Sequence, residues 1–421
     1  MAKISSNTFK LILFLSFLLV LFLAFFRTVG PKSDYGPLVP KATHANGQHY
    51  IGSESCKECH AEIYKTHIET AHYKTSAPAT PTSVKGSFET GHNTFKLSDR
   101  VLFKMTKTED GLYQEVWDTK SKRLRLRSKM DIVVGSGVKG QSFLHWRENE
   151  LFQLQLSYFT PSDSWANSPG MGTELLMDPR PANAKCLECH TTFAEATSLY
   201  GMGNKYNRGQ IVYRVDCERC HGPSMDHVLN HRNHPELKVP SSILKYDTLT
   251  QKQRTDVCSL CHSGIRTDIK PAFLFLAGDS LENFSLPDQG TSISEEIDVH
   301  GNQYDLLSRS ECFKQSPTMD CTTCHDPHRN QRGDTNYFNR KCMECHQNTN
   351  GPDPVFRKSH LGKGNDCIAC HMPLKPSKSM RMPFGNGDVK IPVQVRTHFI
   401  DIYRNTTLKS QTEQTRHPFV P

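Results

Sequence analysis

Seven copies of one five-residue motif, Cys-x-x-Cys-His, constrain this chain of 421 residues more than any other feature. Each copy is the attachment signature of a c-type haem. The two thiols add to the two vinyl groups of one porphyrin, and the next histidine supplies the proximal nitrogen to the iron. The motif cysteines are Cys56, Cys59, Cys186, Cys189, Cys217, Cys220, Cys258, Cys261, Cys321, Cys324, Cys342, Cys345, Cys367 and Cys370. The proximal histidines are His60, His190, His221, His262, His325, His346 and His371.

Other uses of Cys-x-x-Cys pairs fit this pattern less well. Zinc ribbons combine such pairs around a metal, thioredoxin-like proteins use one pair in redox exchange, and secreted chains use cysteines in disulfides. None of these requires a histidine directly after the second cysteine, and here all seven pairs have one. We therefore predict seven covalently attached haem c groups. The cysteine outside the motifs, Cys312, is expected to be a buried, unpaired thiol.

The first thirty residues are predicted to be a separate segment. Lys3 and Lys10 precede an apolar run, 11–26, that only Ser16 interrupts. This pattern is typical of a secretory signal peptide or a signal anchor, and the sequence leaves cleavage open. In both cases we expect an exported protein, either periplasmic or anchored in the membrane and facing the periplasm. Residues 31–49 contain several prolines and glycines and are predicted to be a tether.

Residues 50–421 are predicted to form one body rather than separable domains. Hydrophobic residues make up 36% of the chain and aromatic residues 9%, which is little for an apolar core of this size. Seven porphyrins would supply the missing apolar surface. The expected fold class is a mostly α and irregular multihaem cytochrome c body packed around seven haems, with a small antiparallel β subdomain inserted at 88–160.

The inserted segment differs from the rest because its residues alternate between apolar and polar. Residues 101–117 are predicted to form a hairpin around Glu109-Asp110-Gly111, and 142–159 a second hairpin around Arg147-Glu148-Asn149. A further strand is predicted within 123–134. We interpret this β-rich insert as structural cover, and a docking face or a wall around one haem is the alternative.

The formal net charge of +8 would permit binding to nucleic acid or to an anionic surface. Ionised haem propionates would offset most of this charge, and no basic run interleaved with aromatic residues stands out. We therefore expect no nucleic-acid partner. The expected partners are other redox proteins or membrane quinol-linked donors, with membrane anchoring through the N-terminal segment if it is retained.

Histidines outside the motifs are candidates for the sixth iron ligand. There are fourteen of them, which is twice the number needed for two histidine ligands on every haem. His72 and His67 follow the first motif on a predicted helix, and both are candidates. His328 lies three residues after His325, and it cannot reach round to the opposite face of the same ring. If His328 binds iron, that iron belongs to a neighbouring haem.

Three motifs and the residues after them resemble multihaem cytochromes c. Cys217–His221 continues as Gly-Pro-Ser-Met-Asp-His, Cys321–His325 as Asp-Pro-His, and Cys367–His371 as Met-Pro. The family that they resemble includes the tetrahaem electron acceptor of hydroxylamine oxidoreductase. It shares a haem-packing core with pentahaem nitrite reductase and octahaem hydroxylamine oxidoreductase. The resemblance covers roughly residues 50–75 and 180–400, and the insert is similar to a β-rich piece of some heptahaem relatives.

This resemblance implies parallel and perpendicular haem pairs, nearly all with two histidine ligands. The chain has no Cys-x-x-Cys-Lys motif and no recognisable tyrosine for a haem crosslink, which argues against the two enzyme activities of those relatives. The distal ligands that the resemblance implies are His227, His328, His360 and His398, with His72 and His300 as less secure matches.

Two functions are consistent with these features. The first is an electron-transfer protein that passes single electrons along a haem stack between a membrane-side donor and a periplasmic or surface acceptor. The second is a multihaem oxidoreductase that acts on a small nitrogen or sulfur compound at one haem with an open coordination position. Cys258–His262 has no evident partner histidine nearby and is the candidate for such an open site. No residue is assigned a catalytic role.

Overall fold

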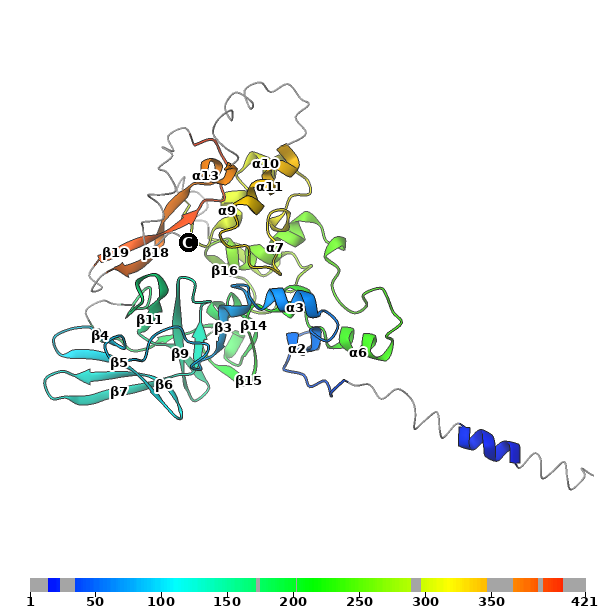
Figure 1. Ribbon diagram of the computed structural model, residues 1–421, viewed down its shortest axis with the longest axis horizontal. Coiled ribbons are helices and arrows are strands. Elements are labelled where there is room, and N and C mark those ends of the chain that lie inside the picture. Colours follow the sequence, from blue (N-terminus) through cyan, green and yellow to red (C-terminus); the bar gives the residue numbers. More distant parts are fainter. Residues whose placement is uncertain are drawn as a thin grey trace, which may run out of the picture.

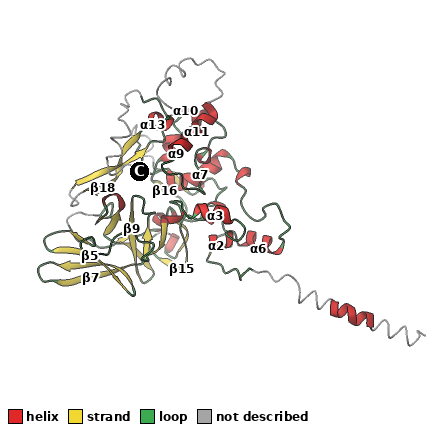
Figure 2. Cartoon of the chain, in the orientation of Figure 1, coloured by secondary structure: helices red, strands yellow, loops and turns green. Residues whose placement is uncertain are grey.

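The computed structural model describes residues 14–22, 35–171, 175–201, 203–288, 297–346, 366–384 and 389–403. Of these residues, 28% are in helices and 29% in strands. The expectation of a mostly α and irregular body is therefore wrong, because strands also occur far outside 88–160 (Figure 2). The physical reason is that a Cys-x-x-Cys-His motif needs only one helical turn. Seven motifs therefore leave most of the intervening chain free to form hairpins.

A four-stranded antiparallel sheet contains the first predicted hairpin. Its order along the sheet follows the sequence, β4-β5-β6-β7. The turn at Glu109-Asp110 is two residues long, and the hairpin is in register from Val101 opposite Asp118 to Thr108 opposite Gly111. The strands are β4 (Thr94–Lys96), β5 (Val101–Thr108), β6 (Gly111–Asp118) and β7 (Arg123–Met130).

A seven-stranded antiparallel sheet contains the second predicted hairpin, β9–β10, with Arg147 opposite Glu150. The order is β12-β11-β9-β10-β13, and β8 joins β9 to β3. This sheet uses segments on both sides of the range 88–160. Its strands are β3 (Ser76–Pro78), β8 (Ile132–Val134), β9 (Gly140–Arg147), β10 (Glu150–Gln153), β11 (Leu156–Phe159), β12 (Ser164–Asn167) and β13 (Arg180–Pro181).

The described residues also form four two-stranded antiparallel ribbons, one before the first motif and the others between or after the motifs. The last of them follows the seventh motif, in a region where the sequence analysis expected one short extended piece. The pairs are β1 (Ala42–Thr43) with β2 (His49–Tyr50), β14 (Thr191–Ala196) with β15 (Tyr206–Tyr213), β16 (Arg266–Asp268) with β17 (Ser285–Pro287), and β18 (Leu374–Phe384) with β19 (Val389–Arg396).

The helices of the body are short, and most of them carry a motif or follow one. Figure 1 shows α7, α9, α10 and α11 grouped on the opposite side of the molecule from β4–β7. The helices are α2 (Ser53–Cys56), α3 (Ala61–His67), α4 (Ala184–Glu188), α5 (Cys217–His221), α6 (Met225–Asn233), α7 (Gln251–His262), α9 (Gln303–Leu307), α10 (Glu311–Gln315), α11 (Thr335–His346) and α13 (Cys367–His371), with the 3-10 turns η1 (Tyr73–Thr75), η2 (Thr160–Ser162), η3 (Leu199–Gly201), η4 (Tyr246–Thr248), η5 (Leu281–Asn283) and η6 (Cys321–Thr323).

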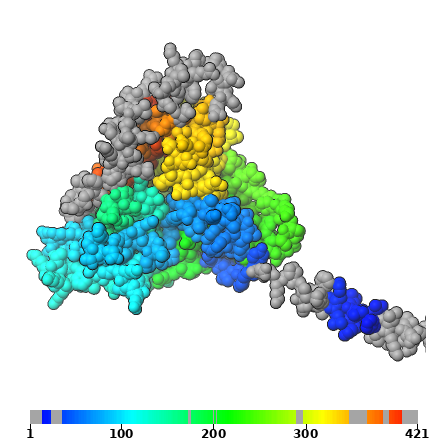
Figure 3. Space-filling model, in the orientation of Figure 1, coloured from blue at the N-terminus to red at the C-terminus, as the bar shows by residue number. Residues whose placement is uncertain are grey.

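The hydrophobic clusters connect the sheets to the motif-bearing part. Leu187, inside the second motif, is 1% exposed and packs in one cluster with Leu151 of β10 and Tyr206 of β15. Phe159 of β11 shares another cluster with Met382 of β18. The sheets therefore pack against the turn that carries the second motif and against β18, and Figure 3 shows the surface of these parts.

Of the predicted N-terminal apolar run, the structure describes residues 14–22, which are helical. The rest of that run and residues 27–34 lie outside the described residues. Within the described part of the chain, we find no helix whose length and apolar character suffice to cross a membrane.

Candidate haem-binding sites

The motifs lie on or beside helical turns, two of them at the ends of the twelve-residue helices α7 and α11, and residues at i, i+3 and i+4 of a helix share one face. Such a turn presents both thiols and the histidine to the same side. Four of these turns begin with an Asn or Asp side chain that accepts a backbone N–H, and such N-caps contribute about 1 kcal/mol each. The caps are Asn183 for Cys186, Asp216 for Cys217, Asp320 for Thr322 and Asp366 for Ala369.

The motif cysteines are available for thioether bonds. All fifteen cysteines lie in the described part of the chain, and all are free thiols. In the same part of the chain, no group of three or more His, Cys, Asp or Glu side chains has the arrangement of a metal site. Cys312 is half-buried rather than fully buried, and it is not in a disulfide.

Three motif histidines face another histidine at the spacing that a haem iron requires. With iron–nitrogen bonds of about 2 Å on both sides and half of each ring added, two axial imidazole centroids lie about 6 Å apart. The ring centroids are 6.2 Å apart in each of three pairs, with interplanar angles of 73°, 16° and 25° respectively. The pairs are His72 with His262, His221 with His328, and His325 with His398.

Three other predicted iron ligands, His190, His227 and His371, are held through Nδ1, which leaves Nε2 to face a metal. The Nδ1 atom of His227 donates to the Ser241 carbonyl at 2.7 Å, and that of His371 donates to the Asp401 carbonyl at 2.9 Å. The Nδ1 atom of His190 lies 2.9 Å from the Thr75 hydroxyl. A hydrogen bond of this kind fixes the tautomer and the orientation of a ligating imidazole. The donor set therefore fits haem ligation through Nε2.

Burial also favours the neutral imidazole that binds iron. Burial, with the nearby His262, lowers the pKa of His72 to about 4. Burial, with the nearby His325, lowers the pKa of His398 to about 4. Burial, with the nearby His328, does the same for the pKa of His221. All of these rings are therefore neutral at pH 7.

Helix α6 brings His227 to the first motif. Two nitrogens of Arg232 bond to the carboxylate of Glu58, which lies between Cys56 and His60, at 2.6–3.2 Å. The ring of His227 is close enough to His60 for the two to interact electrostatically. His231 lies on the same helix, with its ring centroid 4.6 Å from that of His227 and its Nε2 buried without a hydrogen-bond partner. The sequence analysis did not single out His231, although its i+4 spacing from His227 was a usable signal.

The remaining predicted ligands are less well defined. His300 follows Asp298, whose carboxylate accepts backbone N–H groups of Lys378 and Ser379 on β18. Among the described residues, no motif histidine ring faces that of His300 with centroids about 6 Å apart. His360 lies outside the described residues. His67 is 7% exposed, neither ring nitrogen has a hydrogen-bond partner, and its Nε2 is 3.6 Å from Asp216.

His190, like His60, has no histidine ring facing it at the spacing above among the described residues. Its pKa is lowered to about 4 by burial alone, without a contribution from another histidine. Among the described residues, no histidine ring contacts it. His262, by contrast, faces His72, so the structure does not favour the open site that we expected at Cys258–His262. The sequence could not separate these cases, because His72 lies far from His262 along the chain.

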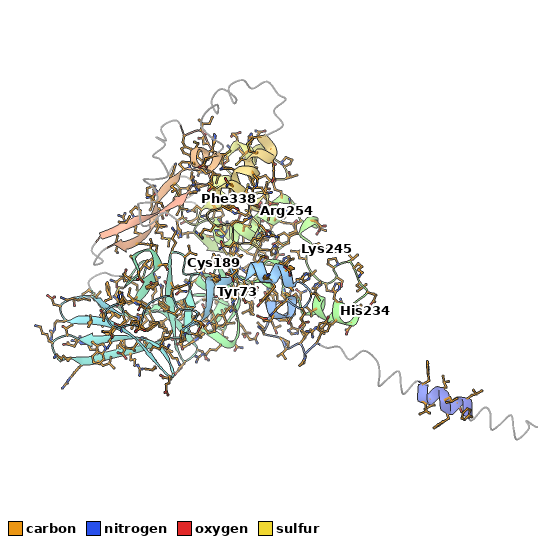
Figure 4. All side chains as sticks on the ribbon, in the orientation of Figure 1. Tyr73, Cys189, His234, Lys245, Arg254 and Phe338 are labelled. Carbon is orange, nitrogen blue, oxygen red and sulfur yellow. The ribbon has the colours of Figure 1, made fainter. Side chains whose placement is uncertain are left out.

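The motifs meet in groups that are distant in sequence. Helix α2 contacts α5, α7 contacts η6, and α11 contacts α13. Figure 4 marks Cys189 and Arg254 from this inner region. Thiols of different motifs lie close enough to interact in four pairs, which are Cys56 with Cys217, Cys189 with Cys261, Cys258 with Cys321, and Cys342 with Cys367. Electrostatic contacts of Cys220 with Cys258 and of Cys324 with Cys342 join these pairs into one series.

Comparison with known proteins gives one match. Residues 161–222, which include the second and third motifs, match the family model described as cytochrome c554 and c-prime. No curated protein matches the chain. No solved structure matches it. The match covers only this part of the chain, and it supports a c-type cytochrome, with haem c as the cofactor, electron transfer as the process and redox proteins as the partners.

Proposed function

We propose that the protein is an exported heptahaem c-type cytochrome that passes single electrons along a haem stack between redox partners. The observation that carries this proposal is the set of three histidine pairs with centroids 6.2 Å apart. When bound, haem c supplies the one-electron chemistry. The chain supplies two imidazoles to an iron, which leaves its coordination nearly unchanged on reduction and occupies the position that a substrate would need.

The proposed electron route follows the contacts between motifs. In order, it runs through the first, third, fourth, fifth, sixth and seventh motifs, because a thiol of each lies close enough to interact electrostatically with a thiol of the next. The second motif joins the series at the fourth, through Cys189 and Cys261. We propose His72, His227, His300, His328, His360 and His398 as six of the seven distal ligands.

We also propose that the first motif lies at the membrane-facing end, with a quinol-linked protein as the donor. Arg232, which binds Glu58 of that motif, also donates to the Gly36 carbonyl at 2.7 Å and lies over the Tyr35 ring at 4.8 Å. The predicted tether is thus attached beside the first motif. Retention of the apolar N-terminal segment as an anchor would bring this end towards the bilayer.

Reductive titration of the purified holoprotein tests the carrier function. A carrier takes up one electron per haem, reversibly, and each ferric haem is low-spin before reduction. Mixing the reduced protein with nitrite, hydroxylamine or sulfite should then leave it reduced. Rapid reoxidation by one of these compounds, with product formed over many cycles, would contradict the carrier function.

The environment of His190 favours a second candidate, a multihaem oxidoreductase with one open haem at Cys186–His190. Among the described residues, no histidine faces His190, and its Nδ1 is held by Thr75. Such a site would act on a small nitrogen or sulfur compound. Cyanide binding to the ferric protein tests it: one rapidly binding haem supports the enzyme, and no binding supports the carrier.

A further inference from the structure

Arg219 is a buried positive charge that contacts two motifs and lies close to a third. It belongs to the motif Cys217–His221 on α5, and its side chain is 7% exposed. Its guanidinium is 3.9 Å from the carboxylate of Glu188, which belongs to the motif Cys186–His190. It also lies over the Phe273 ring, 5.7 Å from the ring centroid. The nitrogen nearest to Glu188, Nη2, is buried and is too far from that carboxylate for a hydrogen bond.

Arg219 lies beside groups that belong to two other motifs. Its guanidinium is close to Glu188 and to the thiols of Cys261 and Cys189. Those two thiols belong to the fourth and second motifs, at the point where the second motif joins the proposed route. An arginine is charged at any pH that a folded protein survives. Arg219 is therefore a permanent charge at a branch point.

Glu188 carries the opposite charge at the same place. It is 3% exposed, accepts the backbone N–H of Phe273 at 2.7 Å, and binds Lys185 at 2.9 Å. Charges in such a low-dielectric environment act on each other and on neighbouring groups more strongly than charges in water do. The fold thus holds the Arg219 guanidinium and the Glu188 carboxylate beside the same pair of attachment sites, with Lys185 as a second, less buried cation on Glu188.

We propose that Arg219 raises, and Glu188 lowers, the reduction potential at the junction of the second and fourth motifs. The proposal rests on haem c being attached at these motifs. With haem c held at Cys186–His190 and Cys258–His262, transfer between the two motifs would move one electron and no bond or proton. The electron lowers the local charge by one unit, so a nearby cation favours the reduced state and a nearby anion favours the oxidised state.

Spectroelectrochemical titration of the full-length holoprotein tests the proposal with a pair of neutral variants. In Arg219→Gln, we expect at least one haem to become tenfold harder to reduce, which corresponds to about −59 mV for one electron. In Glu188→Gln, the shift should have the opposite sign. Arg219→Lys keeps the charge and should shift the potentials less than Arg219→Gln does.

Arg147→Gln is the matched control. Arg147 also lies over an aromatic ring, 4.9 Å from the centroid of Phe152, but it is exposed on β9. Its loss should leave every potential unchanged. Unchanged potentials in both Arg219→Gln and Glu188→Gln, or shifts of the same sign, would overturn the proposal. If Arg219→Gln fails to fold, the reduction potentials of Glu188→Gln decide: a rise supports the proposal, and unchanged or lower potentials overturn it.

The haem content of each variant separates this proposal from the proposed function. A wild-type protein without haem at the second and fourth motifs would contradict the proposed function itself. A wild-type protein and variants with full haem content but equal potentials would contradict only the role of Arg219 and Glu188.

Discussion

Replacing His328 by alanine should convert one haem from low-spin to high-spin and leave all seven haems attached. His328 faces His221 with ring centroids 6.2 Å apart and planes 16° from parallel, so one iron fits between the two rings. Alanine lacks every atom that could reach that iron. The covalent bonds of the third motif, at Cys217 and Cys220, are not touched by the substitution. The expected change is therefore one haem in seven.

The nearest substitute ligand is not in position to hide this effect. The His67 ring centroid is also 6.2 Å from that of His328, but the Nε2 atom of His67 lies 3.6 Å from the Asp216 carboxylate. His67 would have to leave its site beside Asp216 and replace the missing imidazole. The double variant His67→Ala, His328→Ala tests whether His67 does so. If His67 stays in place, the double variant should have the same high-spin fraction as His328→Ala.

The assay is electron paramagnetic resonance of the ferric protein, with pyridine haemochrome analysis of the same sample. His234→Ala is the control, because His234 is largely exposed and its neighbour is Glu236, 3.4 Å away. That variant should keep the wild-type spectrum. A fully low-spin spectrum in His328→Ala, with all haems present, would refute the assignment of His328 as an iron ligand.

Two further predictions concern stability. Leu187→Ala removes a side chain that is 1% exposed and packs between the second motif and the sheets. It should lower the free energy of unfolding, measured in urea, by about 2–5 kcal/mol. The control Leu124→Ala, on the exposed strand β7, should change that free energy little. A wild-type value for Leu187→Ala would contradict this packing. Burial tends to raise the pKa of Asp320, but hydrogen bonds from Thr322 and Arg254 outweigh burial and lower it. The stability that Asp320 contributes is therefore present above the unfolded pKa of about 4 and is lost as pH falls through the lower folded pKa. Asp320→Asn keeps a capping oxygen but loses the charge, so its acid denaturation curve should be flatter than that of the wild type, and parallel curves would contradict the assignment.

The attachment sites were readable from the sequence because their chemistry is local. Cys-x-x-Cys-His fixes two thiols and one imidazole within five residues, and residues such as Asp216 and Asp320 cap the turns just before them. The hairpin around Glu109-Asp110 was also readable, because alternation and a turn signal lie within one short segment.

The rest depends on contacts between distant residues. Thr75 holds His190 from 115 residues away, and Glu218 accepts the N–H of Gly52 from 166 residues away. No local pattern marks such partners. The fold class was wrong for a related reason: the hairpins β14–β15 and β18–β19 pack against motifs and sheets, and a single-strand pattern does not show that a partner strand exists.

Pyridine haemochrome analysis of the mature, purified chain tests the central claim most directly. The account predicts seven haems per chain, one for each Cys-x-x-Cys-His motif. Four or fewer haems per fully matured chain would contradict it.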